Sequence, residues 1–471
     1  MMPRTAPAID ISRYDVRGPR YTSYPTALQF SGNFSAEDYR AWWPRDTASG
    51  APLSLYVHVP FCRDICYYCA CNKIVTRKPE AARQYLGYLK KEIALQGELA
   101  GNTRPVTQLH FGGGTPTYLN GAELTELVYS LANHFHLNND DSREYSIEID
   151  PRTVDRNLLA LLKGLNFNRI SFGVQDFDPA VQKAINRIQP LAMVAELTDA
   201  ARAFAFDSIN FDLIYGLPLQ SANSFVQTLH RVINLRPDRI ALYNYAHMPE
   251  RFPSQRALDR LRRPAALDKL LLLNLACEML QEAGYLHIGM DHFVLPGDAL
   301  ARAQKNGSLE RNFQGYSTSH ARDLIGLGVS AIGSTAHGYA QNAKELPAYY
   351  ALLDENRLPI AKGLPLNADD RVRKFAIMQI ICNLKLDFAA LRAHFDIDFH
   401  TYFSAEQAAL RSLCNDGLLT LDDACLSVTE RGRFLLRNIC MVFDRYLPAH
   451  AAQPRDLPLQ SPPARGHSRT L

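Results

Sequence analysis

The chain has 471 residues, enough to bury a large core in two or three domains. Its 51 Lys and Arg residues against 48 Asp and Glu residues leave a net charge of +3, which excludes a strong overall field for nucleic acid or an anionic membrane. The first residues, Met1–Arg4, contain no apolar stretch, and the longest apolar run, 270–280, is too short to span a membrane. We therefore expect a soluble cytoplasmic protein with no nucleic-acid or membrane partner.

The first 295 residues predict an arm followed by alternating strands and helices. Residues 1–50 are irregular and rich in turn signals, and they predict an N-terminal arm. Between 51 and 295, strands are predicted at 53–60, 106–111, 145–149, 169–174, 208–214 and 239–245, with helices near 80–99, 121–135, 155–164, 192–205, 222–234 and 265–283. Six such repeats indicate parallel α/β units that close into a full or partial barrel, with its chemistry at the C-terminal ends of the strands.

After residue 295 the alternation stops. Residues 296–365 are rich in glycine and polar side chains, and they predict a connecting region that lines a pocket. Residues 366–447 are mainly helical with a hairpin near 422–428, an order that resembles a winged helix. Few basic residues are adjacent there, so a covering or packing domain is favoured over DNA binding. Residues 448–471, rich in Pro, Arg and Ser, predict a disordered tail.

Four of the nine cysteines lie within residues 62–71, spaced C-x3-C-x2-C-x-C, directly after the first predicted strand. Clustered cysteines without a secretory signal indicate a metal or redox site rather than disulfides. A structural zinc site usually takes a second pair of ligands further along the chain, and none follows, whereas iron–sulfur clusters accept ligands from one short loop. Zinc, or merely reactive thiols, remains the alternative. The other five cysteines lie among apolar neighbours and are expected to be buried.

Polar residues follow the ends of several predicted strands. The run 112–116, Gly-Gly-Gly-Thr-Pro, could bring backbone N–H groups to a ligand, although a plain tight turn explains it equally well. Glu148, Gln175 and Asp212 end three consecutive strands, and Arg187 follows a little further on. One such carboxylate is often only a helix cap. Three polar strand ends suit ribose hydroxyls and an α-amino group, and the arginine suits a carboxylate.

The spacing of Cys62, Cys66 and Cys69 resembles the signature of the radical S-adenosylmethionine (SAM) superfamily. The resemblance implies that these three thiolates hold a 4Fe–4S cluster, whose fourth iron binds the amino and carboxylate groups of SAM. Cys71 is then surplus to the ligand set. The glycine run resembles the superfamily motif that contacts the amino group of SAM, although Thr115 stands where many members have glutamate.

Several further segments resemble one family within this superfamily, the oxygen-independent coproporphyrinogen III oxidases. The matching segments run from about residue 14 to 447 and include 19–27, 71–77, 112–118, 173–177, 212–218, 289–293, 312–316 and 437–440. The resemblance implies a partial (β/α)6 radical SAM barrel. It also implies an N-terminal arm and a mainly helical, winged-helix-like C-terminal domain over the opening.

Members of this family bind two SAM molecules, and the resemblance transfers both sites. The cluster-bound SAM would be surrounded by Tyr56, Gly113, Glu148 and Ile332. The second would be held by Tyr68, Cys71, Gly114, Thr115, Gln175, Arg187, Asp212 and Ala246. Phe313 and Gln314 would lie near the cofactors from the C-terminal side. Ala70 departs from the glycine usual between the last two cysteines, and the match fades around 334–337.

The reaction implied is the anaerobic oxidative decarboxylation of two propionates of coproporphyrinogen III to vinyl groups, giving protoporphyrinogen IX in haem biosynthesis. A 5′-deoxyadenosyl radical would take a hydrogen from the propionate carbon β to the carboxyl, and the substrate radical would then lose CO2 and an electron. A low-potential electron donor such as a flavodoxin system is implied. The absence of a long heptad seam predicts a monomer. Arg20, Tyr21 and Tyr24 are candidate contacts for the polyanionic substrate, although an arm packed on the barrel explains them as well.

Three other functions stay open from the sequence. A haem chaperone of the same superfamily would share the barrel, but that branch generally lacks both the fourth cysteine and the segment 19–25, and this chain has both. A radical SAM methyltransferase acting on haem would release S-adenosylhomocysteine. A zinc-stabilised regulatory protein would contain zinc and no iron.

Overall fold

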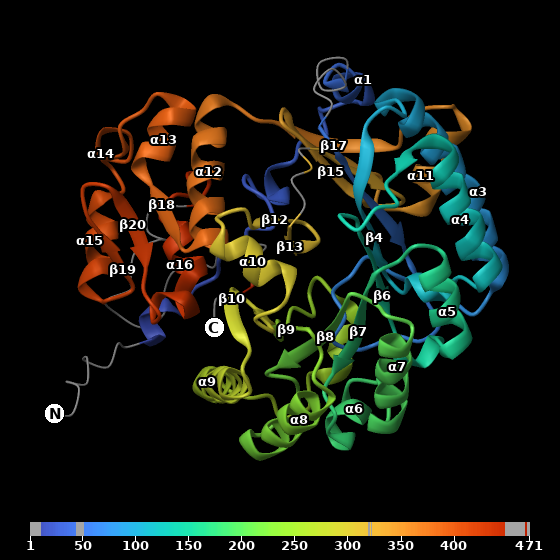
Figure 1. The fold of residues 1–471 in the computed structure, drawn as a ribbon, viewed down its shortest axis with the longest axis horizontal. Helices are drawn as coiled ribbons and strands as arrows, with labels where there is room; N and C mark the ends of the chain where they lie inside the picture. Colours follow the sequence, from blue (N-terminus) through green and yellow to red (C-terminus); the bar gives the residue numbers. More distant parts are fainter. Residues whose placement is uncertain (1–10, 44–50, 319–320, 322, 448–466, 469–471) are drawn as a thin grey trace.

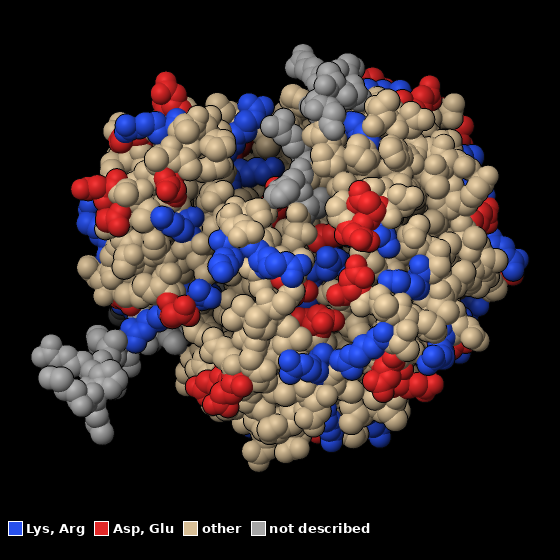
Figure 2. Space-filling model, viewed as in Figure 1, with Lys and Arg blue, Asp and Glu red and all other residues tan. Residues whose placement is uncertain are grey.

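The structure is a computed structural model that describes residues 11–43, 51–318, 321, 323–447 and 467–468. Figure 1 shows a curved sheet with helices along its outer side, a second group of helices beside it, and the N-terminal segment running between the two. Within the described ranges, no helix is long and apolar enough to cross a membrane. Figure 2 shows acidic and basic side chains interspersed over one face, in keeping with the net charge of +3.

Six neighbouring parallel strands form the middle of the main sheet, and each agrees with its predicted bounds to within two residues. In spatial order they are β1 (Leu53–Val59), β4 (Pro105–Gly113), β6 (Glu144–Ile149), β7 (Arg169–Gln175), β8 (Ser208–Tyr215) and β9 (Arg239–Asn244). Most of their residues are buried, as expected when helices cover one face and other chain segments cover the opposite face. The C-terminal ends of all six strands therefore meet at one rim.

The six predicted helices are also present, with ends within two residues of the prediction. They are α3 (Pro79–Ala100), α4 (Gly121–His134), α5 (Arg156–Gly164), α7 (Leu191–Ala203), α8 (Ala222–Leu235) and α9 (Ala266–Glu282), and a shorter α6 (Pro179–Ala184) follows β7. Local capping sets two of the starts: Asn120 and Ser221 each accept a hydrogen bond from the third helical residue in a reciprocal capping box. Figure 1 shows the helices outside the strands.

The sheet continues past both ends of the parallel group. On one side, β14 (Asp323–Leu327) pairs in parallel with β1, and β15 (Ile332–Thr335), β16 (Gly338–Asn342) and β17 (Ile360–Pro365) follow antiparallel. On the other, β11 (His292–Val294) and β10 (Leu286–Gly289) pair antiparallel beyond β9. In the described chain β10 and β17 are the two edges of the sheet, so the barrel is open. The segment expected only to connect domains thus also supplies strands.

Two buried polar groups fasten the added strands to the barrel. Arg104, just before β4, donates to Asp323 Oδ2 at 2.6 Å, and both side chains are at most 3% exposed. Glu92 on α3 accepts from the backbone N–H of Gly328 at 2.7 Å and from Asn342 Nδ2 at 2.6 Å. Burial raises the pKa of Glu92 to about 7, against these hydrogen bonds. The register of β14 to β16 is therefore tied to the barrel core.

Smaller elements complete the barrel region. A hairpin of β12 (Glu310–Asn312) and β13 (Gly315–Ser317) extends toward the barrel, and α11 (Leu346–Asp354) packs against α3. Other short elements are α1 (Ala36–Arg40), β2 (Phe61–Cys62), β3 (Ile74–Val75), β5 (His136–Leu137) and α10 (Ala299–Lys305).

The C-terminal residues form a mainly helical domain whose apolar core also includes residues of β10, β11, α10 and β13. It contains α12 (Ala368–Asn383), α13 (Phe388–Phe395), α14 (Phe399–Tyr402), α15 (Gln407–Asn415) and α16 (Leu436–Met441). The hairpin predicted near 422–428 is present as β19 (Leu419–Leu421) and β20 (Cys425–Val428), and β18 (Lys385–Asp387) adds a third strand. Helices followed by a small antiparallel sheet agree with the winged-helix-like prediction.

The described part of the N-terminal arm belongs to both apolar cores. Tyr39 and Trp43 pack into the barrel core, whereas Tyr14, Tyr21 and Tyr24 pack into the core of the C-terminal domain. The arm therefore fastens the helical domain beside the rim of the barrel (Figure 1). Its predicted segments 1–10 and 44–50 lie outside the described residues, as does the predicted tail apart from 467 and 468.

Candidate active site

The cysteine loop leaves the C-terminal end of β1 and is held by the segment that follows β7. The backbone N–H of Tyr67 donates to the carbonyl of Ile185 at 3.0 Å, and Asn186 Nδ2 donates to the carbonyl of Ile65 at 2.7 Å. Because β1 and β7 end at the same rim, these bonds lay the loop across the opening of the barrel. This is the position that the (β/α) arrangement predicts for chemistry.

Cysteine side chains and cations meet in this loop. Cys66 Sγ lies 3.5 Å from Arg187 Nη1 and 3.7 Å from Arg152 Nη2. Cys62 Sγ lies 3.4 Å from Thr115 Oγ1. Burial raises the pKa of Cys62 to about 11, the Thr115 hydroxyl opposes that rise, and the nearby Cys69 and Cys66 add to it. The thiols of Cys62, Cys66 and Cys69 therefore lie close enough to influence one another.

The fourth cysteine modifies the third rather than completing a ring of thiols. A hydrogen bond from Cys71 is the largest cause that lowers the pKa of Cys69, and burial opposes it. Lys73 adds to the lowering and donates its ammonium to the carbonyl of Cys69 at 3.1 Å. Among the described residues, no three His, Cys, Asp or Glu side chains converge closely enough to ligate a single ion.

The donor set fits an iron–sulfur cluster. Three thiols come from one short loop, and two guanidinium groups lie beside the middle one, Cys66. Thiolates bound to iron carry negative charge, which the neighbouring arginines would partly balance.

The glycine run packs the end of β4 against the end of β1. A Cβ on Gly114 would lie 2.6 Å from the carbonyl oxygen of Pro60, and one on Gly113, where φ is +121°, would lie 2.8 Å from the His58 ring. Glycine is therefore required here by the close approach of the two strands. The backbone N–H of Gly113 donates to Glu148 Oε2 at 3.2 Å, which couples the turn to the end of β6.

A row of polar side chains crosses the inner face of the sheet from β1 to β6. Tyr56 stacks on His110 with ring centroids 5.9 Å apart, and His110 lies 2.6 Å from Ser146 Oγ and 3.3 Å from Glu148 Oε1. The Tyr56 hydroxyl lies 3.0 Å from His58 Nδ1, which connects the row to the cysteine loop. His110, Ser146 and Glu148 of this row line a cavity of about 130 Å³ inside the barrel, together with Asp212, Tyr243 and Gln314.

Asp212 faces the same cavity from β8. It accepts hydrogen bonds from Ser171 Oγ at 2.9 Å and from Asn210 Nδ2 at 3.0 Å. Burial, followed by the nearby charge of Glu148, raises the pKa of Asp212 to about 6, although the two hydrogen bonds oppose the rise. An acceptor held in this way by its own neighbours can receive hydroxyl donors from a ligand.

When the pH is raised from about 4 to about 6.5, we expect the free energy of unfolding of the wild type to fall by about 2 to 3 kcal/mol relative to that of Asp212→Asn. The pKa of this carboxyl is raised to about 6 in the folded state. Its contribution to stability is therefore fully present at pH values below the pKa of the unfolded chain, and it is lost as the pH rises through about 6. Urea unfolding of cluster-free protein at several pH values measures the difference. The exposed Asp141→Asn variant is the control, and parallel curves for wild type and Asp212→Asn would contradict the prediction.

Arg187 joins the cysteine loop to the ends of β6 and β7. Its guanidinium donates to Asp150 Oδ2 at 3.0 Å and to the carbonyl of Gly173 at 2.7 Å, besides its contact with Cys66. Arg152 also binds Asp150, at 2.7 Å. Burial raises the pKa of Asp150, but the two arginines outweigh this and hold it below its usual range. Asp150 and Arg152 were absent from the predicted site residues, and the Asp-Pro-Arg sequence at the end of β6 was their only signal.

Three more of the predicted residues meet near the loop. Gln175, at the end of β7, is buried and has a φ of +65°, and its amide faces the position that a Cβ on Gly173 would take. Gln255 Nε2 donates to the carbonyls of Tyr68 at 2.9 Å and Ala246 at 3.1 Å. This bridge brings the cysteine loop and the end of β9 together. Gln255 was not predicted, because it lies in an irregular segment without a motif.

The β12–β13 hairpin places Phe313 and Gln314 beside the barrel from the C-terminal side. Phe313 packs edge-on against Tyr339, in an apolar group that also includes Ile332. The amide of Gln314 lines the barrel cavity, and neither its Nε2 nor its Oε1 has a hydrogen-bond partner among the described residues although both atoms are buried. A buried amide without partners is costly, so this one is available to a polar ligand.

The three arm residues that were predicted to contact substrate separate into two groups. Arg20 donates to the carbonyl of Asn244 at 3.2 Å and lies over the Tyr243 ring, 5.8 Å from its centroid. Tyr21 and Tyr24 are 1% and 0% exposed, and the Tyr21 hydroxyl donates to Asp444 Oδ2 at 2.9 Å. The structure therefore brings Arg20 to the rim and places both tyrosines against the C-terminal domain.

Comparison with known proteins matches two described families and full-length relatives. Residues 56–232 match the Radical SAM superfamily, and residues 366–435 match the HemN C-terminal domain. Curated oxygen-independent coproporphyrinogen III oxidases are 48% identical in Pseudomonas aeruginosa, over 93% of this chain and 95% of that one, and 46% identical in Escherichia coli, over 93% and 94%.

A solved structure gives the same result. The chain resembles the coproporphyrinogen III oxidase (HemN) of Escherichia coli, described as a radical SAM enzyme, with a TM-score of 0.87 and 45% identity over 91% of this chain and 98% of that one. The chain therefore belongs to the oxygen-independent coproporphyrinogen III oxidases, a family of radical SAM enzymes.

Proposed function

We propose that this enzyme converts coproporphyrinogen III to protoporphyrinogen IX by anaerobic oxidative decarboxylation of two propionates to vinyl groups. The observation that carries the proposal is family membership over nearly the whole chain, joined to a cysteine loop at the C-terminal rim of a barrel whose interior holds a polar cavity. The haem chaperone and the haem methyltransferase are not favoured, because the full-length relatives are oxidases by name.

Cys62, Cys66 and Cys69 would hold the 4Fe–4S cluster, and Cys71 would stay outside the ligand set. When bound, the cluster and SAM supply a low-potential electron and the 5′-deoxyadenosyl radical that removes hydrogen from the substrate. The residues of the chain position these groups. Glu148, whose carboxylate already accepts from the Gly113 N–H, suits the amino group of the cluster-bound SAM.

Two SAM molecules are part of the proposal. The cluster-bound SAM would lie among Tyr56, Gly113, Glu148 and Ile332. The second would lie among Tyr68, Cys71, Gly114, Thr115, Gln175, Arg187, Asp212 and Ala246, with Phe313 and Gln314 beside both. Support for the second site comes from the Asp212 acceptor, the Arg187 cation and the Gln255 bridge between Tyr68 and Ala246. We also propose a monomeric cytoplasmic enzyme that takes electrons from a flavodoxin-type donor.

The arm and the C-terminal domain would exclude water from the reaction. A primary carbon radical reacts with any nearby C–H bond, so its environment must be closed and ordered. Phe313, Ile332 and Tyr339 form an apolar layer beside the cavity, and the arm tyrosines hold the helical domain next to it. These contacts support a chemical role for the covering domain beyond stability.

The direct test is anaerobic incubation with coproporphyrinogen III, SAM and a reductant. We expect a product lighter by two CO2 and four hydrogens in all, since each propionate becomes a vinyl group with loss of CO2 and two hydrogens. Mass analysis of the oxidised porphyrin detects this change. A methylated porphyrin with S-adenosylhomocysteine, or a stable haem complex without decarboxylation, would contradict the proposal.

Gln314→Leu should weaken SAM binding about tenfold without lowering the stability of the SAM-free protein. The buried amide of Gln314 lacks hydrogen-bond partners among the described residues, so leucine of similar volume avoids the free-energy cost of burying these polar atoms when SAM is absent. The same change removes the proposed hydrogen bonds to SAM. Calorimetry with SAM and thermal unfolding without it measure the two effects. Gln379→Leu, on α12, is the matched control, and unchanged SAM affinity in Gln314→Leu would contradict the assignment.

A further inference from the structure

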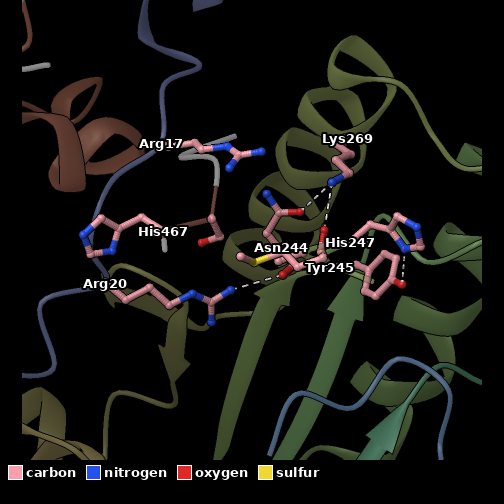
Figure 3. A pocket seen from close by; sticks show the side chains of 10 residues that line it. Arg17, Arg20, Asn244, Tyr245, His247, Lys269 and His467 are labelled. Atoms are coloured by element: carbon pink, nitrogen blue, oxygen red, sulfur yellow. Dashed lines mark hydrogen bonds between the residues drawn. The ribbon is translucent and has the colours of Figure 1, made fainter. Parts of the chain in front are cut away.

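A second cavity, here called the arm–β9 cavity, lies at the C-terminal end of β9 and has a volume of about 180 Å³. Figure 3 shows Arg17 and Arg20 reaching it from the arm and Lys269 reaching it from α9. Lys269 Nζ donates to Asn244 Oδ1 at 3.1 Å and to the carbonyl of Tyr245 at 2.9 Å, which fixes its ammonium at the wall. Three cations from two separate elements therefore converge on one hollow.

The described lining of this cavity contains no Asp or Glu residue. Arg17 makes neither a hydrogen bond nor an ion pair in the part of the chain that the structure describes, and Arg20 donates only to the carbonyl of Asn244 and forms no ion pair there. Arginine side chains at protein cavities are usually matched by carboxylates, because an unbalanced charge near low-dielectric walls is unfavourable. The lining is therefore complementary to an anion, and the fork of a guanidinium suits a carboxylate.

Arg437 adds positive charge beside this region, and the carboxylate of Asp291, close to Arg20 and Arg437, offsets part of it. Arg437 donates to the carbonyl of Pro19 at 3.1 Å, and its pKa is lowered to about 10, first by burial and then by the nearby charge of Arg20. The pKa of His467, which lines the cavity, is lowered to about 4 by burial and then by Arg437. His467 is therefore uncharged at neutral pH, and the charge of the cavity comes from the two arm arginines and Lys269.

The arm–β9 cavity is next to the barrel cavity. Arg20 lies over the Tyr243 ring, 5.8 Å from its centroid, and Tyr243 lines the barrel cavity together with Asp212. Ala246, which is proposed to contact the second SAM, lines the arm–β9 cavity itself. A single layer of side chains thus separates the two cavities. One large ligand with several side groups can therefore reach both of them.

We propose that the arm–β9 cavity is a carboxylate subsite that binds a propionate of the tetrapyrrole other than the one being decarboxylated, with Arg17, Arg20 and Lys269 as its cations. This inference rests on the proposed function, because it assumes a substrate with four propionates of which two react. Binding energy from a remote, unreactive group can hold the reacting propionate in place. Arg17 and Lys269 are thereby specificity-determining residues.

The test measures binding of coproporphyrin III, the stable oxidised form of the substrate, to the cluster-loaded enzyme by fluorescence quenching. Arg17→Gln and Lys269→Gln should each weaken binding about tenfold, as expected for loss of one charge-assisted hydrogen bond. Arg17→Lys keeps the positive charge and should weaken the binding of coproporphyrin III much less. Arg83→Gln and Lys90→Gln on α3 are matched controls that should bind like wild type, since neither residue lines the cavity.

A second measurement separates this proposal from the proposed function. SAM cleavage by the reduced enzyme without porphyrin should be equal in Arg17→Gln, Lys269→Gln and wild type, which shows that the variants fold and load their cluster. Failure of the wild-type enzyme to bind coproporphyrin III or to decarboxylate coproporphyrinogen III would refute the proposed function itself. Tight wild-type binding that Arg17→Gln and Lys269→Gln both retain would overturn the subsite alone.

Discussion

Cys66→Ser protein, purified without oxygen, is expected to contain almost no iron and to cleave no SAM. Cys66 is buried between Arg187 and Arg152, and its thiolate is one of three proposed to hold the cluster. A serine hydroxyl at this position is a poor iron ligand, and two remaining thiolates do not secure a four-iron cluster. Iron per chain and the brown absorbance measure the loss. Cys62→Ser and Cys69→Ser should behave in the same way.

Two other cysteines serve as controls for this result. Cys425→Ser, in the hairpin of the C-terminal domain, should retain full iron and activity. Cys71→Ser should retain its cluster and lose substrate turnover, because Cys71 is proposed to contact the second SAM rather than iron. A fully loaded Cys66→Ser protein would refute the ligand assignment, whereas iron depletion in Cys71→Ser would make that residue a ligand.

Arg187→Met is expected to lower the free energy of unfolding of the cluster-free protein by about 3 kcal/mol. Its side chain is 8% exposed and bonds both Asp150 and the carbonyl of Gly173, so methionine leaves a buried carboxylate and a buried carbonyl short of donors. The effect is below the largest expected for a broken buried pair, because Arg152 still binds Asp150. Denaturant unfolding under anaerobic conditions measures the change.

Arg152→Met is the matched control for Arg187→Met. It removes the other partner of Asp150 but is 22% exposed, and about 1 kcal/mol is expected because solvent reaches the site more easily. Arg187→Lys keeps the positive charge but not the paired N–H donors of a guanidinium, so its free energy of unfolding should fall by an intermediate amount. Equal stability of Arg187→Met and wild type would show that the observed bonds contribute nothing net to the fold.

The six parallel strands and their helices could be predicted because their sequence signals are local. Buried parallel strands appear as short apolar runs, and the helices between them repeat at the spacing of one turn. The added strands β14 to β17 escaped prediction, since β14 and β16 are five residues long, wholly buried and contain glycine or small side chains. Gly326 illustrates the reason: a Cβ there would lie 2.6 Å from the carbonyl carbon of Ile332, a contact that only tertiary structure reveals.

The site was predictable in part for a related reason. Residues within motifs, such as the cysteines and Asp212, carry their identity in the sequence. Gln255 and Arg152 act through contacts with segments more than 80 residues away along the chain, and no motif in the sequence around them indicates these contacts. Tyr21 and Tyr24 show the reverse, because a recognisable motif proved to contain residues packed against the C-terminal domain.

By itself, the sequence determined the cysteine loop, the order of strands and helices, and the polar residues at the strand ends, because each depends on neighbours along the chain. Only the tertiary structure decided which cations face the cavities and which are paired. Arg17 and Arg187 are equally charged in the sequence, yet Arg187 is bound to Asp150 and Arg17 faces a cavity without a described carboxylate. Whether two charges pair depends on the distance between them in space, and folding sets this distance for residues far apart in the sequence.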